Sequence, residues 1–264
     1  TGGRREIRAP YLSLLECQRW INDNILSALS PHACATGYVT GRSIRDHASP
    51  HVDAGFVLTI DLENFFPTIS FSRVISIFRG LGYSGQVSTS LAKLCCLDNV
   101  LPQGAPTSPS LSNIVCKRLD EKLERFAIES GLRYTRYVDD MCFSGGEIKK
   151  HTLDEIEKIV SSEGFRTNKS KTHLHAPRSN LKLVTGVNVA LGKMSLPKSY
   201  KRAISTDLFH IEKYGLRSHL AKRKIRDPNY IEALVGKVGY WLFIEPENKR
   251  AQHYKQVLAQ FVNI

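Results

Sequence analysis

Apolar residues follow a strand-like pattern at three places in the first half of the chain. Phe56 to Ile60 is a short, β-favouring apolar run that predicts a buried strand, and it ends at Asp61. Leu132 to Tyr137 and Met141 to Ser144 are two more such runs. Only Val138-Asp139-Asp140 separates them, which predicts a hairpin with acidic residues at its tip. The strands therefore carry carboxylates at their ends.

Helical spacing dominates elsewhere. It predicts a helix over 12–29, one after Ser70, and one long helix to Phe126 that starts with Ser108 as its cap and Pro109 in its first turn. A further helix is predicted to begin with a capping box at Thr152 and to end near Gly164. A further strand is predicted over 182–189. Basic helices then follow over roughly 200–214, 230–243 and 248–262. Mixed strands and helices followed by helices alone predict an α+β domain, residues 1–198, and a helical domain, residues 199–264.

Charge narrows the class of partner. Lys and Arg number 37 against 25 acidic residues, which gives a net charge of +12 and a pI near 9.5. This surplus favours a polyanionic partner, nucleic acid before membrane, although a merely basic protein explains the charge alone equally well. No apolar run reaches 18 residues and no signal peptide is present, so we expect no membrane contact. The chain opens at Thr1, and we expect a natural N-terminus to precede it.

The cysteine pattern excludes two kinds of site. None of the six cysteines forms a C-x-x-C pair, and most lie among apolar residues: Cys17, Cys34, Cys95, Cys96, Cys116 and Cys142. Neither a zinc site nor a disulfide framework is predicted. Buried thiols in a reducing cytoplasm are the simpler interpretation.

The candidate catalytic residues are three aspartates: Asp61, Asp139 and Asp140. Two Mg²⁺ ions about 3.5–4 Å apart activate an attacking hydroxyl and stabilise a leaving oxygen. Mg²⁺ is held by one or two carboxylates together with substrate phosphates, which one strand end and a neighbouring hairpin tip can supply. An isolated Asp-Asp pair is far more often a polar turn, so the pair carries weight only together with other motifs.

Three motifs together provide that support. Tyr137-Val138-Asp139-Asp140 resembles the Y-x-D-D box of reverse transcriptases. The segment from Leu101 to Pro109 resembles their L-P-Q-G-x-x-x-S-P motif, and Asp61 to Phe66 resembles the D-x-x-x-F-F motif that carries the first catalytic aspartate. The motifs stand in the order and at the spacing of the family. Val184-Thr185-Gly186 resembles the V-T-G element of retron enzymes, and His47 to His51 resembles their N-A-x-x-H element, with His47 in place of Asn.

The resemblance implies a right-hand polymerase, with fingers and palm on an antiparallel sheet and a C-terminal helical thumb. It implies a cytoplasmic bacterial reverse transcriptase that copies part of a cognate noncoding RNA into a branched RNA–DNA hybrid (msDNA). It further implies dNTP substrates and, within antiphage defence, an effector protein as partner. Two alternatives stay open: another bacterial reverse transcriptase, of group II intron or diversity-generating type, and an RNA-binding scaffold that lacks catalysis.

The resemblance also assigns roles to residues. It implies that Asp61, Asp139, Asp140 and the Leu62 carbonyl hold two Mg²⁺ ions. The nucleotide would be bound by Arg5, Phe66, Gln103, Gly104 and Lys171, with Phe66 as a steric gate against the ribose 2′-OH. Basic thumb residues would hold the RNA–DNA duplex through its phosphates: Lys198, Lys201, Arg202, Lys222, Arg223 and Lys224.

Overall fold

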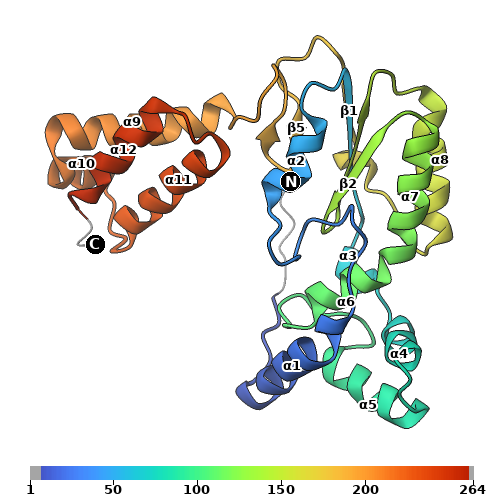
Figure 1. The fold of residues 1–264 in the computed structure, drawn as a ribbon. Helices are drawn as coiled ribbons and strands as arrows, with labels where there is room; N and C mark the ends of the chain where they lie inside the picture. The colour runs from blue at the N-terminus through green and yellow to red at the C-terminus, as the bar shows by residue number, and fades with distance from the viewer. Residues whose placement is uncertain (1–6, 262–264) are drawn as a thin grey trace. The chain divides into compact units, whose positions relative to one another are not determined.

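The computed structural model describes residues 7–261 (Figure 1). It divides into two compact units, Thr1–Arg178 and Ser179–Ile264. This division comes earlier than residue 198, where the sequence placed a boundary. One reason is that the segment before the basic helices is tied to them: the Leu196 N–H donates to the Glu245 carboxylate over 2.7 Å. The functional assignment of the two parts stays a prediction.

A four-stranded sheet lies at the centre of unit 1. Its order is β2-β3-β1-β4, formed by β1 (Phe56–Asp61), β2 (Arg133–Tyr137), β3 (Asp140–Gly145) and β4 (His173–His175). All neighbouring strands are antiparallel. The predicted strand and hairpin are therefore confirmed, and the α+β class with an antiparallel sheet is confirmed with them.

Helices cover this sheet and extend it. They are α1 (Leu12–Asn24), η1 (Leu26–Ala28), α2 (Ile44–Ala48), η2 (Ser49–His51), α3 (Phe65–Thr68), α4 (Phe71–Gly80), α5 (Gly85–Cys95), α6 (Ser108–Val115), α7 (Lys117–Glu129), α8 (Lys150–Ser162) and η3 (Lys169–Lys171). Helices α7 and α8 lie side by side along the sheet, whereas α1, α4, α5 and α6 gather beyond the end of β1 that carries Asp61 (Figure 1). A continuous apolar core joins both parts, with Phe78, Leu111, Leu119 and Phe143 fully buried.

Two helix predictions were wrong in detail. The long helix from Ser108 is interrupted at Cys116, so α6 and α7 are separate helices. Ser108 is the first helical residue rather than the cap, and its hydroxyl donates to the Pro102 carbonyl over 2.7 Å. The capping box at Thr152 is also wrong: α8 begins at Lys150, and Thr152 is buried inside its first turn. Burial and tertiary hydrogen bonds override local capping signals here.

Unit 2 begins with a small hairpin and continues as helices. Strands β5 (Leu183–Val184) and β6 (Val187–Asn188) pair antiparallel and precede α9 (Lys198–Tyr214), α10 (Leu216–Arg223), α11 (Tyr230–Ile244) and α12 (Lys249–Ala259). A single strand over 182–189 was therefore the wrong prediction. Thr185 and Gly186 both have positive φ, 46° and 84°, which is the conformation of a tight two-residue hairpin turn.

Two exclusions from the sequence can be compared with the structure. All six cysteines are free thiols. Among the described residues, no helix is both long and apolar enough to span a bilayer.

Candidate active site

Asp61 and Asp140 are brought face to face by the sheet. They are paired residues at the ends of the antiparallel strands β1 and β3. Directly opposed residues on such strands have Cβ atoms about 4.5–5.5 Å apart and point to the same face. Asp61 is 8% exposed, whereas Asp140 is half-buried. Two predicted catalytic carboxylates thus share one face at one end of the sheet.

Asp139 is held beside them by the backbone. The Leu62 N–H donates to the Asp139 carbonyl over 3.0 Å, so the strand after Asp61 continues to pair with the hairpin turn. The N–H and C=O of one residue in a strand lie toward the same neighbour. The Leu62 carbonyl is therefore on the side of the hairpin, where the sequence predicted an extra metal ligand.

Lys171 reaches the same point from a third segment. Its Nζ lies 3.0 and 2.9 Å from the two carboxylate oxygens of Asp61. The backbone places it there, because the Asn168 N–H donates to the Asp61 carbonyl over 2.8 Å and the Asn168 side chain caps the short helix η3. The sequence predicted Lys171 as a nucleotide contact. The structure adds that its ammonium pairs with the first catalytic candidate.

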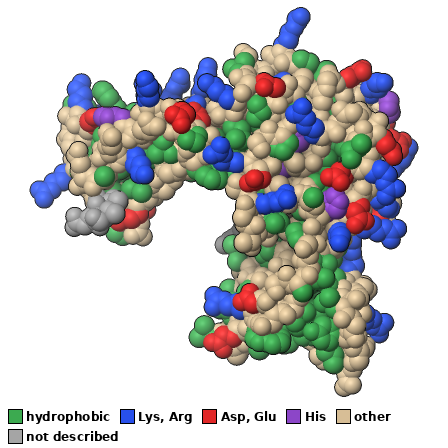
Figure 2. Space-filling view, viewed as in Figure 1, with side chains coloured by type: hydrophobic (Ala, Val, Ile, Leu, Met, Phe, Trp, Pro, Cys, Tyr) green, Lys and Arg blue, Asp and Glu red, His purple; other side chains and the backbone are tan. Residues whose placement is uncertain are grey.

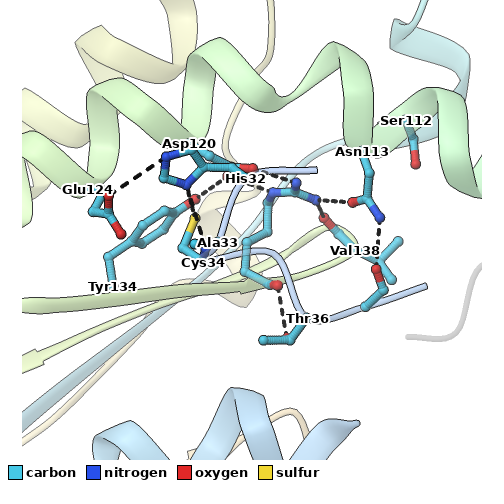
Figure 3. Close-up of polar contacts among 12 residues, drawn as sticks. His32, Ala33, Cys34, Thr36, Ser112, Asn113, Asp120, Glu124, Tyr134 and Val138 are labelled. Carbon is cyan, nitrogen blue, oxygen red and sulfur yellow. Dashed lines mark hydrogen bonds and ion pairs between the residues drawn. The ribbon is translucent and has the colours of Figure 1, made fainter. Parts of the chain in front are cut away.

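The hairpin tip rests on a buried charged network that the sequence analysis missed (Figure 3). Arg136, one residue before the box, is fully buried. Its guanidinium donates to both oxygens of Asp120, over 2.8 and 2.6 Å, to the Asn113 side-chain oxygen over 3.1 Å, and to the Val138 carbonyl over 2.9 Å. The Tyr134 hydroxyl donates to Asp120 over 2.9 Å. The network thus ends directly on the turn that carries Asp139.

That turn has an unusual backbone. Val138 has φ +61°, in the left-handed region that β-branched residues rarely adopt. Gly37 packs against it so closely that a Cβ there would lie 2.7 Å from both the Val138 nitrogen and Cγ2. The Asn113 amide donates to the Gly37 carbonyl over 2.9 Å, which connects this contact to Arg136. Such a conformation persists only where its surroundings over-determine it, as the network does here.

A signal for this network was present in the sequence. Residues two apart in a strand face the same side, so Arg136 shares its side with Tyr134 and Leu132, and both of these are buried. A buried guanidinium requires a carboxylate partner. Burial is the largest single influence on the pKa of Arg136 and lowers it, but the Asp120 carboxylate, its hydrogen bond and the nearby Cys116 and Tyr134 together hold that pKa well above its usual value. The identity of the partner on α7 could not be read from the pattern.

A second buried polar cluster lies against β2 and β3. The Thr135 hydroxyl is 2.7 Å from Nδ1 of His47 and 2.7 Å from Nε2 of His51. The Ser144 hydroxyl is 2.7 Å from Nδ1 of His51. His47, which departs from the expected Asn, therefore uses its ring nitrogen to satisfy Thr135. The His47 ring also packs on Tyr137 of the box at 5.8 Å between centroids.

We predict that these histidines make folding acid-sensitive. Burial lowers the pKa of His47 and of His51 to about 3, from an ordinary value near 6.5. Between these values the unfolded chain binds protons that the folded chain does not. Stability is therefore complete above pH 6.5 and is lost as the pH falls toward 3, by up to about 1.4 kcal/mol per pH unit for each histidine.

Thermal unfolding between pH 7.5 and 5 tests this prediction. His47→Asn should reduce the slope of stability against pH, because one of the buried histidines that bind a proton only on unfolding is removed. His151→Asn, at an exposed histidine of α8, is the matched control against which the slope of His47→Asn is compared. An unchanged slope in His47→Asn would contradict the assignment.

The predicted nucleotide contacts lie on two nearby segments. Phe66 is half-buried, whereas Phe65 is 4% exposed and stacks on Phe165 at 5.9 Å. Gly104 has φ +111°, and a Cβ there would lie 3.0 Å from the Arg8 carbonyl oxygen. The Gln103 carbonyl accepts from the Arg8 N–H over 2.8 Å, so this loop packs on the chain's first described residues. Arg5 lies outside the described residues. The roles of Phe66, Gln103 and Gly104 stay predictions.

The predicted duplex contacts differ in how available they are. Lys and Arg side chains are spread over the visible face of unit 2 (Figure 2). Lys198, Arg202, Lys222 and Lys224 are exposed. Lys201 instead pairs with Glu245 over 2.9 Å, and Arg223 pairs with Asp207 over 2.5 Å. Lys201 and Arg223 therefore have structural partners, and duplex binding by all six stays a prediction.

The donor set suits a hard cation. Within residues 7–261 we find no group of three or more His, Cys, Asp and Glu side chains already spaced to hold a metal ion. Mg²⁺ needs less than this, because one or two carboxylates and substrate phosphates suffice. Asp61 and Asp140 share one face, Asp139 is in the adjoining turn, and a cationic group, Lys171, already lies on Asp61. The residues present fit Mg²⁺ by ligand type and by placement.

Comparison with known proteins decides the family. The family described as "Reverse transcriptase (RNA-dependent DNA polymerase)" matches residues 9–225, which is most of the chain. This chain belongs to the reverse transcriptase family. Its right-hand polymerase fold follows from that membership, and the antiparallel sheet of unit 1 agrees with it.

Several relatives of this chain are retron reverse transcriptases. Retron Ec86 reverse transcriptase of Escherichia coli is 39% identical over 78% of this chain and 65% of its own length. Retron Mx65 reverse transcriptase of Myxococcus xanthus is 37% identical over 72% and 49%. Retron Ec73 reverse transcriptase of Escherichia coli is 30% identical over 100% and 87%. The retron type is thus confirmed, and the chain spans from about half to two thirds of the first relatives it matches.

Among solved structures, a telomerase from Candida albicans in complex with a fragment of telomeric RNA has a TM-score of 0.45 and 11% identity. The match covers 94% of this chain and 55% of that chain, a likeness too low to bear on function.

Proposed function

We propose that this chain is an RNA-directed DNA polymerase that copies part of a cognate structured RNA into DNA joined to that RNA. The observation that carries the proposal is the pairing of Asp61 with Asp140 at one end of the sheet, with Asp139 in the adjoining turn. This is the place where the family's three aspartates are expected. The retron relatives support an RNA template, and the branched product is proposed from the family resemblance alone.

The residues of the site would have separate roles in nucleotidyl transfer. A primer hydroxyl attacks the α-phosphate of a dNTP, the new P–O bond forms, and pyrophosphate leaves. Two Mg²⁺ ions held by Asp61, Asp139 and Asp140 would activate the hydroxyl and neutralise the leaving charge. Arg136 fixes the turn that aims Asp139. Lys171 offers a positive charge beside Asp61, where a triphosphate would approach.

Phe66 gives a prediction about substrate choice. Phe66→Val should raise the relative use of rNTPs by roughly tenfold or more, because a smaller side chain leaves room for the 2′-OH; tenfold corresponds to about 1.4 kcal/mol. The measurement is the ratio of kcat/KM for a dNTP and its matching rNTP. Phe66→Tyr keeps the ring and serves as the control. An unchanged ratio in Phe66→Val would remove Phe66 from the gate.

Priming from a 2′-OH of the RNA has its own test. RNA that copurifies with the chain would be sequenced, supplied again with dNTPs, and the product treated with ribonuclease. We expect a DNA strand that keeps a ribonucleotide joined at its start, since synthesis begins on a 2′-OH of the RNA. DNA with a free 5′ end would contradict priming from a 2′-OH. An antiphage role and an effector protein are proposed from the family resemblance alone.

A further inference from the structure

Unit 2 contains a pocket, and three of its lining residues are also predicted duplex contacts: Lys198, Lys201 and Arg202. Its volume is about 690 Å³, and it is lined by α9, α11 and α12 together with the Asn248 cap of α12. This volume lies within the range typical of sites for small organic ligands. All its lining residues belong to unit 2, so the pocket is defined without reference to the aspartate site.

One face of α9 presents three kinds of side chain to the pocket in order. Lys198 and Arg202 come first, Ser205 and Thr206 follow, and Phe209 is last. Spacings of three and four residues keep them on one side of the helix. From Arg202 to Phe209 the helix advances about 10 Å. Cations, hydroxyls and an aromatic ring thus follow one another in the order of the phosphate, ribose and base of a nucleotide.

The cationic end of the pocket favours phosphate. Lys198, Arg202 and Arg250 are exposed and line it, and none of its lining residues is Asp or Glu. Lys201, which also lines the pocket, is already paired with Glu245 over 2.9 Å. The three other cations are therefore the ones available for a ligand. Guanidinium groups such as those of Arg202 and Arg250 bind phosphate oxygens with two hydrogen bonds at once.

The other end favours a base. Trp241 is 2% exposed and Tyr254 is 7% exposed, so both form a firm wall. The Trp241 Nε1–H and the Ser205 hydroxyl are buried with no hydrogen-bond partner among the described residues. An unmatched buried polar group costs about 1–3 kcal/mol, which favours a ligand with polar atoms of its own. Phe209, at 51% exposure, presents a ring at the rim on which a base can stack.

We propose that this pocket binds one unpaired nucleotide of a structured RNA, with its phosphates on Lys198, Arg202 and Arg250 and its base against Trp241 and Phe209. The proposal rests on the proposed function for its choice of RNA. A base in a duplex is stacked and paired, and its ring face is hidden, so a continuous duplex cannot fill an aromatic recess. Bulges and loops expose such faces, and aromatic side chains recognise them. A phosphate ion alone would leave the aromatic wall unused.

Binding to two matched RNAs tests the proposal. One is a short paired stem, and the other is the same stem with a single bulged adenosine. Their dissociation constants for the full chain would be compared by fluorescence anisotropy at one fixed salt concentration. We expect the bulged stem to bind about tenfold more tightly, as stacking of one base on an aromatic ring provides. Equal affinity of the wild-type chain for both stems would overturn the proposal.

Variants then show which residues cause the preference for the bulged stem. Phe209→Leu should bring the ratio of the two affinities close to one, and because Phe209 is on the surface its replacement leaves the core intact. Arg202→Gln should weaken binding of the bulged stem more than that of the paired stem. Lys255→Gln, an exposed cation on α12 outside the pocket, should keep the wild-type ratio. A tenfold ratio retained in Phe209→Leu would place the preference elsewhere and overturn the proposal.

Two further measurements distinguish a failure of the pocket proposal from a failure of the proposed function. Adenosine monophosphate would compete with the bulged stem; competition at the concentration where the bulged stem itself competes would show that the pocket takes free nucleotides and overturn the RNA assignment. Primer extension by the wild-type chain on a plain RNA template tests the proposed function separately. If the wild-type chain extends the primer but does not prefer the bulged stem, only the proposal for the pocket is overturned. If the chain prefers the bulged stem but does not extend the primer, only the proposed polymerase function is overturned.

Discussion

Asp139→Asn with Asp140→Asn should abolish DNA synthesis while RNA binding persists. The expected fall in kcat is about three orders of magnitude or more, equivalent to losing roughly 4 kcal/mol of transition-state stabilisation. Amide oxygens keep the shape of the hairpin tip but lose the charge that holds Mg²⁺. RNA affinity should change less than threefold, since phosphates are bound mainly by Lys and Arg. The measurements are single-nucleotide incorporation and RNA binding by the same preparation.

The control for this pair is an acidic residue away from the site. Asp154→Asn alters α8, on a different element from β1 and β3, and should retain wild-type incorporation. Synthesis that survives in the double aspartate variant would remove these residues from the metal site. Loss of both synthesis and RNA binding would indicate that the hairpin had lost its fold.

Arg136→Met is expected to have the second largest effect. It leaves the Asp120 carboxylate buried and unpaired, which typically costs 3–5 kcal/mol. For a chain of this size the melting temperature should fall by roughly 10 °C. The exposed pair of Lys158 and Glu155 offers the matched comparison: Lys158→Met should cost less than about 1 kcal/mol. A loss for Arg136→Met as small as that for Lys158→Met would contradict the account.

A double variant separates stability from positioning. Arg136→Met with Asp120→Leu replaces both charges with apolar groups, and such replacements are often neutral for stability. The Val138 carbonyl still lacks its guanidinium donor, so we expect stability to recover while kcat stays low and KM for dNTP changes little. Recovery of kcat together with stability would assign Arg136 a purely structural role.

The aspartates could be predicted because short-range patterns specify them. An apolar run that ends at Asp61 and two strand-like runs around Asp139-Asp140 determine the local structure, and the motif spacing identified the family. The buried charged network that holds these aspartates in place could not be predicted in this way. Arg136 meets Asp120 through packing of β2 against α7, and the choice of partner depends on that packing rather than on local sequence.

Local sequence patterns also gave wrong predictions of secondary structure where contacts with other segments determine the fold. Ser108 looked like a helix cap, but its hydroxyl is used by Pro102 in the loop before it. The run from Lys182 to Val189 has a strand's composition, yet the positive φ values at Thr185 and Gly186 fold it into a hairpin. Pairing of a short run with itself rather than with the main sheet is not encoded in its alternation.

Incorporation of a single dNTP opposite a defined RNA template base tests the central claim most directly. The purified chain would be given an RNA template, an annealed primer, Mg²⁺ and one dNTP at a time. We expect extension by the complementary dNTP only, dependent on Mg²⁺ and lost on chelation. Tight RNA binding without incorporation, on this template and on copurified RNA alike, would contradict the polymerase assignment and leave an RNA-binding scaffold.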